Sequence, residues 1–408
     1  IANAARFVLG LLPALLCQPT VWAESATFAE CKGELRNTAL TRGITEATLE
    51  RVFSTIEELP RVVASDRAQP EFTQTFADYY TKRVTAYRVE QGRLLLQEHR
   101  ELLESVTRTS GVPAQYLVAF WGLETNFGRY FGNLYIPSAL ATLACDSRRS
   151  AFFTDQLLAT LQIVDQGDMQ PDQLVGSWAG AIGHMQFMPT TYLAHALDGD
   201  GDDRADLVGS IHDAMASAGQ YLEDIGWQSG FRWGREVTLP RDFDYGLTGS
   251  DQWRPLSAWA HMGVQDTAGQ PLPELDTQSA VILPAGFTGP AFLVYSNFNI
   301  IMKWNRSEFY ALSVGRLADR IAGAGRLHTA LPDTRLSTAE VTRLQEQLAT
   351  LGYEPGLADG VLGPGTRKAT RKFQQDQGLL ADGFPNAAVM AQLDKATAAS
   401  AETPQASP

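Results

Sequence analysis

Helix-forming patterns run through most of this 408-residue chain and are interrupted by one segment of a different character. Amphipathic stretches occupy residues 49–56 and 84–106, and helical spacing continues to about residue 226. Between residues 235 and 292, Pro, Gly and Thr are frequent and the apolar runs are short, which indicates strands and loops. Helical spacing returns at residues 307–322. The sequence therefore predicts a mainly α-helical fold with a small β-containing subdomain.

A second, smaller unit follows a linker at residues 327–336, which contains a proline and has little periodicity. Ser337 and Glu340 have the spacing of a capping box at the start of a helix. Leucines at helical spacing follow them until Gly352 stops the pattern. We predict a small three-helix domain over residues 337–395.

This unit contains a short internal repeat. The sequence Leu-Ala-Asp-Gly occurs at residues 357–360 and again at 380–383, and the two copies bracket a helix. The segment after the unit, residues 396–408, consists mainly of Ala, Ser, Pro and Thr without core residues. We therefore predict a disordered tail there.

Residues 1–23 have the pattern of a secretory signal peptide. Arg6 precedes an apolar run at residues 7–16, and a small-x-Ala cleavage pattern ends at Ala23. The apolar run is too short to span a bilayer, and the two leucines before Cys17 are bulkier than the residues expected beside a lipid-anchor cysteine. We predict an exported, periplasmic protein without a lipid anchor; the alternative is a buried N-terminal helix.

Charge and composition exclude some classes of protein. The formal net charge of −13 argues against a nucleic-acid-binding surface, which needs basic residues to neutralise phosphates. No later stretch of about 18 uncharged apolar residues occurs, so we expect no transmembrane span in the mature protein. Cys31 and Cys145 remain after signal removal and could form a disulfide in an oxidising compartment; two buried thiols are the alternative.

A carboxylate lies on an apolar helix face in residues 117–128. Helical spacing places Glu124 on the same face as Leu117, Phe120 and Trp121. Burial there would favour the protonated carboxyl, which is the form that a general acid needs near neutral pH. Glu124 is therefore a candidate catalytic acid; a structural glutamate paired with an arginine is the alternative.

A glycine-rich segment at residues 176–189 has the composition of a groove wall. Its three glycines permit close approach of the backbone, and Ser177 and Gln186 supply neutral hydrogen-bonding groups. This combination suits a polar, uncharged ligand. Tight helix packing through small residues is the alternative, and it would explain the glycines but not Gln186.

An acidic loop follows at residues 198–206. Carboxylates stand at positions 1, 3, 5 and 9 of an EF-hand-like pattern, with a main-chain carbonyl expected at Arg204: Asp198, Asp200, Asp202 and Asp206. Asp203 replaces the usual glycine at the sixth position, and the twelfth position is Gly209 rather than Glu. We predict a structural Ca²⁺ that the chemistry does not require; a solvated acidic loop is the alternative. The His and Cys residues show no zinc-ligand spacing.

Two of these motifs together carry a family resemblance. Glu124-Thr125-Asn126-Phe127-Gly128, followed by residues 180–189, resembles the lytic murein transglycosylase B family, which is lysozyme-like in fold. The likeness also includes residues 69–72, 140–143 with 148–149, and 295–305, so it covers roughly residues 25–325. The resemblance implies a catalytic domain over residues 24–326.

The resemblance also implies roles for individual residues. Glu124 would be the acid and base, and Ser177 and Gln186 would hold the sugar beside it. Asp213 would complete the ligands of the calcium loop. The other substrate-binding residues that it implies are Asn305, Trp304, Tyr79 and Tyr221 in the groove, with Arg148 and Arg149 facing carboxylates of the stem peptide. Trp304 stands where related sequences often have Tyr, and a structural role is the alternative for each.

The C-terminal unit resembles the peptidoglycan-binding-1 domain. The resemblance rests on Leu351-Gly352-Tyr353, Asp359-Gly360, residues 363–366 and Phe373-Gln374. Most of these are turn and core residues, so they identify the module rather than its ligand site.

The sequence as a whole predicts a lytic murein transglycosylase that cleaves the MurNAc-β-1,4-GlcNAc bond. The groove motifs supply one carboxylate, whereas hydrolysis of a glycoside ordinarily uses two, so we expect 1,6-anhydromuramic acid ends. Peptidoglycan glycan strands are the expected partner, and cell-wall synthesis or remodelling assemblies are candidate partners. The alternatives are a hydrolytic muramidase and an inactive peptidoglycan-binding scaffold.

Overall fold

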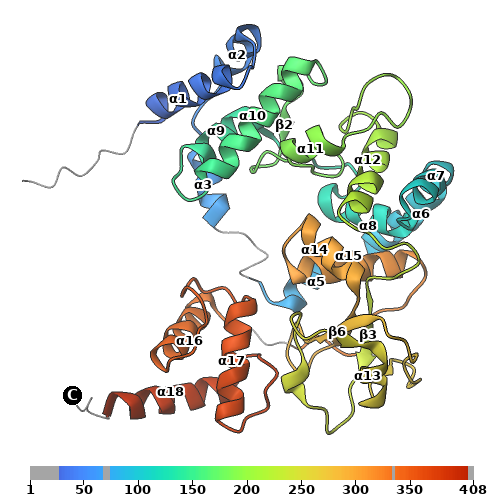
Figure 1. The fold of residues 1–408 in the computed structure, drawn as a ribbon, viewed down its shortest axis with the longest axis vertical. Helices are drawn as coiled ribbons and strands as arrows, with labels where there is room; N and C mark the ends of the chain where they lie inside the picture. Colours follow the sequence, from blue (N-terminus) through green and yellow to red (C-terminus); the bar gives the residue numbers. More distant parts are fainter. Residues whose placement is uncertain (1–26, 68–73, 333–335, 403–408) are drawn as a thin grey trace, which may run out of the picture.

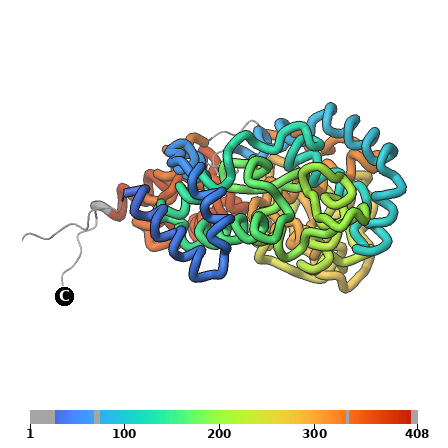
Figure 2. The backbone as a smooth tube through the Cα atoms, turned by 90° about the horizontal axis from the view of Figure 1, so that it is seen from above, coloured from blue at the N-terminus to red at the C-terminus, as the bar shows by residue number. Residues whose placement is uncertain are grey.

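The computed structural model describes residues 27–67, 74–332 and 336–402 (Figure 1). The predicted signal peptide at residues 1–23 and the segment 69–72 lie outside these ranges. Figure 1 shows the first helices (blue) at one end of the long axis and the last helices (red) at the other, and Figure 2 gives the view along that axis. Within the described ranges, no helix combines the length and apolar character needed to cross a membrane.

The first helices pack as short, capped segments. They are α1 (Phe28–Thr41), α2 (Glu46–Phe53), α3 (Pro60–Arg67), α5 (Phe76–Arg83), α6 (Ala86–Glu98) and α7 (Arg100–Ser110). A threonine precedes each of α1, α2, α5 and α6 and accepts the backbone N–H of the third helical residue. This hydrogen bond satisfies a donor that the first helical turn leaves unpaired. The amphipathic stretch predicted at residues 84–106 is divided at His99 into α6 and α7.

Helix α8 (Ala114–Thr125) lies in the main core, and most of its residues are buried. Its sequence is apolar on nearly all sides, as expected for a helix that other elements enclose. It packs against α6, α7 and α15 (Glu308–Ile321). The other helices of this body are α9 (Ile136–Ala144), α10 (Ser150–Gln166), α11 (Pro189–His195), α12 (Ile211–Asp224) and α14 (Ser296–Trp304), with a 3₁₀ turn at Pro171–Gln173.

The segment at residues 235–292 forms the predicted β-containing subdomain. Its antiparallel sheet has the order β4 (Arg254–Pro255), β6 (Gln278–Ile282), β7 (Ala291–Val294), β3 (Gly234–Thr238) and β5 (Gln265–Asp266), accompanied by α13 (Leu256–His261) and a 3₁₀ turn at Tyr245–Leu247. A separate two-stranded ladder pairs β1 (Leu134–Tyr135) with β2 (Val175–Gly176). The mainly α-helical fold with a small sheet is thus confirmed.

The two faces of this sheet belong to different cores. Phe292 and Val294 of β7 pack into the main helical core, whereas Leu293 between them packs into a smaller cluster around Trp259. Side chains alternate between faces along a strand, so one strand can serve both cores. The sheet therefore fixes the subdomain to the helical body through a shared layer of apolar residues.

A disulfide joins Cys31 in α1 to Cys145, the residue that follows α9. The two Cα atoms are 6.0 Å apart, and the cysteines are separated by 114 residues in sequence. The separation lies within the usual range for disulfides. The bond attaches the N-terminal helix to the helical body.

Three helices form the C-terminal unit: α16 (Thr338–Thr350), α17 (Pro364–Asp376) and α18 (Ala387–Glu402). They enclose a small core of their own that contains Leu344, Phe373 and Leu393. The capping box predicted from Ser337 and Glu340 is present at the start of α16.

The C-terminal tail differs from its prediction. Helix α18 continues to Glu402, so residues 396–402 are helical rather than disordered. The reason is the high alanine content of this segment, because alanine has the strongest intrinsic helix propensity. Ala396 also packs against the core of the unit. The remainder of the tail, 403–408, lies outside the described ranges.

Candidate active site

Glu124 lies in the last turn of α8 and is half-buried. The helix ends there because Asn126 and Phe127 adopt the left-handed region, with φ of 51° and 64°. Non-glycine residues rarely occupy this region, and each costs on the order of 1–3 kcal/mol. Gly128 follows with φ of 75°, and a Cβ at that position would lie 2.5 Å from the His184 ring. The chain is therefore held in a strained, close-packed turn directly after Glu124, as is common at functional sites.

Two donors converge on one oxygen of Glu124. The Trp304 indole Nε1 donates to Oε1 at 3.0 Å, and the Tyr310 hydroxyl donates to the same oxygen. Tyr310 is buried, and burial together with the neighbouring Glu124 charge raises its pKa well above the ordinary value of 10.0. Tyr310 therefore remains a protonated donor. Both donors are directed at Oε1 and fix the orientation of that side of the carboxyl group.

Tyr310 was not among the residues that the sequence singled out. It lies in the first turn of α15, far from Glu124 in sequence, and no local pattern connects the two. One signal was available: a tyrosine on the buried face of an amphipathic helix needs a partner for its hydroxyl. That signal calls for a partner but does not identify it.

Trp304 connects Glu124 to a groove with a volume of about 1140 Å³. Its ring lies 4.4 Å from Phe120, 5.3 Å from Tyr221 and 5.5 Å from Phe187, measured between centroids. Trp304 and Tyr221 line the groove together with Asn305. Flat aromatic surfaces beside neutral amides suit the faces and hydroxyls of sugar rings. The structure thus brings the predicted residues Trp304, Tyr221 and Asn305 together beside Glu124.

Ser177 and Gln186 support the loop between them. The Ser177 hydroxyl accepts the N–H of Ala181 at 3.0 Å, and Gln186 Nε2 donates to the carbonyls of Gly183 and Phe131 at 3.0 and 3.3 Å. Gln186 also has a left-handed backbone, with φ of 50°. Both side chains are half-buried. A direct contact between either side chain and a sugar stays a prediction.

The structure corrects the position expected for Tyr79. Its side chain is buried, with 1% exposure, instead of lining the groove. The centroid of its ring lies 6.1 Å from that of Phe309, and the Arg83 guanidinium carbon lies over the ring at 5.1 Å from its centroid. The reason is that Tyr79 lies on the inward face of α5, which packs against α15.

The two arginines expected to face stem-peptide carboxylates share a buried carboxylate. Arg148 and Arg149 both form ion pairs with Asp66 of α3, which is 4% exposed. The Arg149 guanidinium also lies 4.6 Å from the Phe152 ring, and Arg149 and Phe152 line the groove. Two positive charges against one negative leave a net cationic patch, which is compatible with the predicted role but does not test it.

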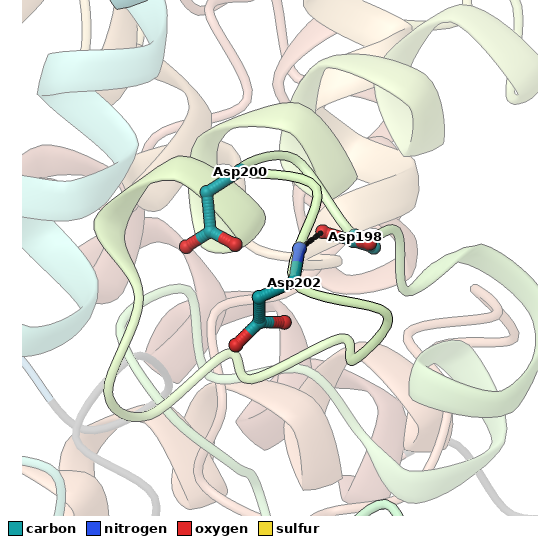
Figure 3. A group of neighbouring side chains, drawn as sticks. All are labelled: Asp198, Asp200 and Asp202. Atoms are coloured by element: carbon teal, nitrogen blue, oxygen red, sulfur yellow. Dashed lines mark hydrogen bonds between the residues drawn. The ribbon is translucent and has the colours of Figure 1, made fainter.

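The acidic loop gathers part of the predicted metal-ligand set. Figure 3 shows the side chains of Asp198, Asp200 and Asp202, and one oxygen from each lies within 4.8 Å of the others. Asp203 at the sixth position has φ of 68°, so the backbone makes the turn that a glycine usually makes there. Hard oxygen ligands in this arrangement fit a calcium ion. Backbone N–H groups already bind Asp198 and lower the pKa of its carboxyl.

The other predicted ligands have different partners. Asp213 is buried in α12, and its two oxygens accept the N–H groups of Gly199 and Asp206 at 2.8 and 2.7 Å. It therefore fastens both ends of the loop to α12, and its role as a calcium ligand stays a prediction. Asp206 in turn accepts the N–H groups of the residues after the loop, and the N–H of Arg204 donates to Asp202. Coordination through the Arg204 carbonyl stays a prediction.

His184 packs beside the turn that follows Glu124. It is 8% exposed, and its Nδ1 accepts the indole N–H of Trp121 at 3.0 Å. Burial lowers the pKa of its imidazole below the ordinary 6.5. These contacts describe a neutral histidine that supports the core.

Comparison with known proteins gives two family matches. Residues 27–319 match the family described as Transglycosylase SLT domain, and residues 337–393 match the Putative peptidoglycan binding domain. The Membrane-bound lytic murein transglycosylase B of Escherichia coli is 30% identical over 250 residues, which are 60% of this chain and 66% of that protein. The chain thus aligns with slightly less than two thirds of this relative's length.

Solved structures show the same likeness. SltB3 from Pseudomonas aeruginosa, in complex with NAG-anhNAM-pentapeptide, is 44% identical with a TM-score of 0.86, covering 90% of this chain and 99% of that one. The Escherichia coli lytic transglycosylase Slt35 in complex with calcium is 27% identical with a TM-score of 0.64, covering 75% and 97%.

Proposed function

The chain belongs to the transglycosylase SLT family, and on this basis we propose that it cleaves the glycan strands of peptidoglycan with Glu124 as acid and base. The observation that carries the proposal is the single carboxylate at the end of α8, held by Trp304 and Tyr310 beside a large aromatic groove. The family resemblance implies the same role for Glu124, as acid and base in the cleavage of the glycosidic bond. Peptidoglycan fragments bound to SltB3 support the choice of substrate.

The chemistry needs two proton transfers by the same residue. Glu124 first donates a proton to the glycosidic oxygen that leaves, which is general acid catalysis. The resulting carboxylate then accepts a proton from the hydroxyl that attacks the sugar. Trp304 and Tyr310 hold Oε1 during both steps, so the carboxyl group keeps its orientation while Oε2 gains or loses the proton.

The attacking hydroxyl belongs to the substrate in this proposal. Among the described residues that line the groove there is no Asp or Glu, whereas hydrolysis with water ordinarily uses a second carboxylate about 5 to 9.5 Å from the first. Attack by the muramyl C6 hydroxyl on its own C1 is intramolecular, so its high effective concentration reduces the need for a separate nucleophile. The products would therefore end in 1,6-anhydromuramic acid.

Mass spectrometry of the products tests this proposal. A digest of purified sacculi should contain muropeptides that are one water lighter than those with reducing ends. A digest dominated by reducing ends would instead identify a muramidase, and the absence of soluble muropeptides would identify a non-catalytic wall-binding protein.

Replacement of the catalytic group tests the assignment of Glu124. Glu124→Gln keeps the size of the side chain but removes its acid and base, so turnover should fall by at least about 10²- to 10⁴-fold. Glu104→Gln, at an exposed position of α7, is the matched control and should retain wild-type turnover. A Glu124→Gln variant that keeps more than about a tenth of the activity would contradict the general acid role.

We further propose that the protein acts in the periplasm and binds Ca²⁺ in the acidic loop. The signal-like residues 1–23 and the Cys31–Cys145 disulfide support an oxidising compartment. The three gathered carboxylates support the cation, as does the calcium complex of Slt35. The ion would stiffen the loop between α11 and α12 and take no part in the chemistry.

A further inference from the structure

The internal repeat of the C-terminal unit is built twice with the same hydrogen bonds. In the first copy, the buried Gln345 receives the N–H of Gly360 and donates to Asp359. In the second copy, the buried Gln374 receives the N–H of Gly383 and donates to Asp382. Each glutamine also donates to the carbonyl of the residue after the glycine. The two copies are therefore structurally equivalent, and differences between them are informative.

The copies differ at the helix positions that face their turns. Seven and three residues before Gln345 stand Thr338 and Thr342; the equivalent positions before Gln374 are Arg367 and Arg371. The residue two positions after the aspartate differs as well, with Val361 in the first copy and Phe384 in the second. The second copy thus carries two cations and an aromatic ring where the first has small, neutral side chains.

Two of these residues, Arg367 and Phe384, contact the β-containing subdomain. Arg367 donates to the carbonyls of Leu283 and Pro284 at 3.2 and 3.1 Å. Phe384 is 9% exposed, and a Cβ on Gly286 would lie 2.9 Å from it. These contacts all involve the turn between β6 and β7.

Asp382 adds a contact that its counterpart does not make. One of its oxygens holds the repeat turn, and the other accepts the N–H of Phe287 at 3.0 Å. Asp382 is 3% exposed, whereas Asp359 in the first copy is exposed. The aspartate of the turn is thus buried against the β-containing subdomain in the second copy and exposed in the first.

The contact continues to the helix that carries Tyr310. Glu308, the first residue of α15, lines a cavity of about 190 Å³ together with Arg367, Arg371 and Asp382. The negative charge of Glu308 acts on both arginines, whose pKa burial lowers from the ordinary 12.5. Glu308 is two residues from Tyr310, which holds the Glu124 carboxyl.

We propose that the second repeat is an intramolecular docking surface that fixes the C-terminal unit on the β6–β7 turn and on the first turn of α15. The C-terminal unit then packs as a part of the domain that contains Glu124. It supports the position of Tyr310, in addition to any role in wall binding. The catalytic consequence rests on the function proposed above. The docking itself does not, so it can be measured separately.

The test exchanges second-repeat residues for those of the first. Two full-length variants are compared: the double variant Arg367→Thr with Arg371→Thr, and the single variant Phe384→Val. Each introduces the side chain that stands at the equivalent position of the first repeat. The control is Arg343→Thr, which removes an exposed arginine whose ion pair with Asp394 lies within the unit. Hydrogen–deuterium exchange of residues 283–290 reports on the Phe287 N–H, which docking protects.

We expect exchange at Phe287 to be on the order of 10- to 100-fold faster in both second-repeat variants, because the loss of the Arg367 hydrogen bonds or of the Phe384 packing makes local opening of the docked turn easier. Turnover of a short soluble glycan should fall roughly tenfold, since small displacements in an active site are costly. The control should change neither. Unchanged exchange in the variants, or equal acceleration in the control, would overturn the docking surface. Faster exchange with unchanged turnover would overturn the proposal that docking supports the position of Tyr310. If the wild-type protein is inactive, the exchange result alone decides whether the second repeat is a docking surface.

Discussion

Removal of the Tyr310 hydroxyl is the most direct test of how the structure prepares Glu124. Tyr310→Phe keeps the ring in the core and deletes one of the two donors on Oε1. Trp304 remains at 3.0 Å, so the hydrogen bond from the indole to Oε1 is retained. The variant should fold, because the ring that fills the core is unchanged.

The expected loss follows from the charge of the acceptor. A hydrogen bond to a charged group contributes about 1.5–3 kcal/mol, and about 1.4 kcal/mol corresponds to a factor of ten in rate. If the bond is needed to hold the carboxylate during turnover, kcat should fall roughly 10- to 150-fold. KM should change little, because Tyr310 is buried and does not line the groove.

The assay is steady-state cleavage of a short soluble glycan, together with the melting temperature of each variant. Tyr295→Phe is a matched control, since Tyr295 is also a buried tyrosine and its ring lies 5.8 Å from the Arg235 guanidinium. A Tyr310→Phe enzyme with more than half the wild-type kcat would refute the reasoning. So would an equal loss of kcat in Tyr295→Phe.

Two further predictions concern stability. Added Ca²⁺ should raise the melting temperature, since a ligand at 100 times its Kd stabilises the native state by about 2.7 kcal/mol; the response should vanish in Asp200→Ala with Asp202→Ala, and an unresponsive wild type would favour a solvated loop. The free energy of unfolding should fall as the pH drops below about 6.5, because burial lowers the pKa of folded His184 and the unfolded chain then binds the extra proton. This part of the pH dependence should be lost in His184→Gln, and an identical pH profile in that variant would contradict it.

Local patterns predicted helix α8 and much of the overall fold. Glu124 could be identified because a carboxylate on an apolar helix face is unusual, and this pattern is visible in a few neighbouring residues of the sequence. The β-containing subdomain could be located from its composition, and the resemblance to the family indicated Trp304, Asn305 and Tyr221 in the groove.

Long-range contacts could not be predicted in the same way. The hydrogen bond between Tyr310 and Glu124 joins residues 186 apart in sequence, and its geometry exists only after α8 and α15 have packed. Tyr79 shows the opposite error: an aromatic residue fits a sugar-binding groove and an apolar core equally well, and only the packing of α5 decides between them. The strand order was similarly hidden, because β3 pairs with β7 across more than fifty intervening residues.

The Cys31–Cys145 bond has a consequence for how the protein is made. The chain has three cysteines, and cleavage after Ala23 would remove Cys17. A processed chain then has two thiols and one available pairing, so oxidation within a single molecule cannot produce a wrong disulfide and no isomerase is needed to correct one. During synthesis Cys31 emerges 114 residues before its partner. The bond can therefore close only after the whole segment from α1 to the end of α9 has been made, so it cannot form within the first helices alone.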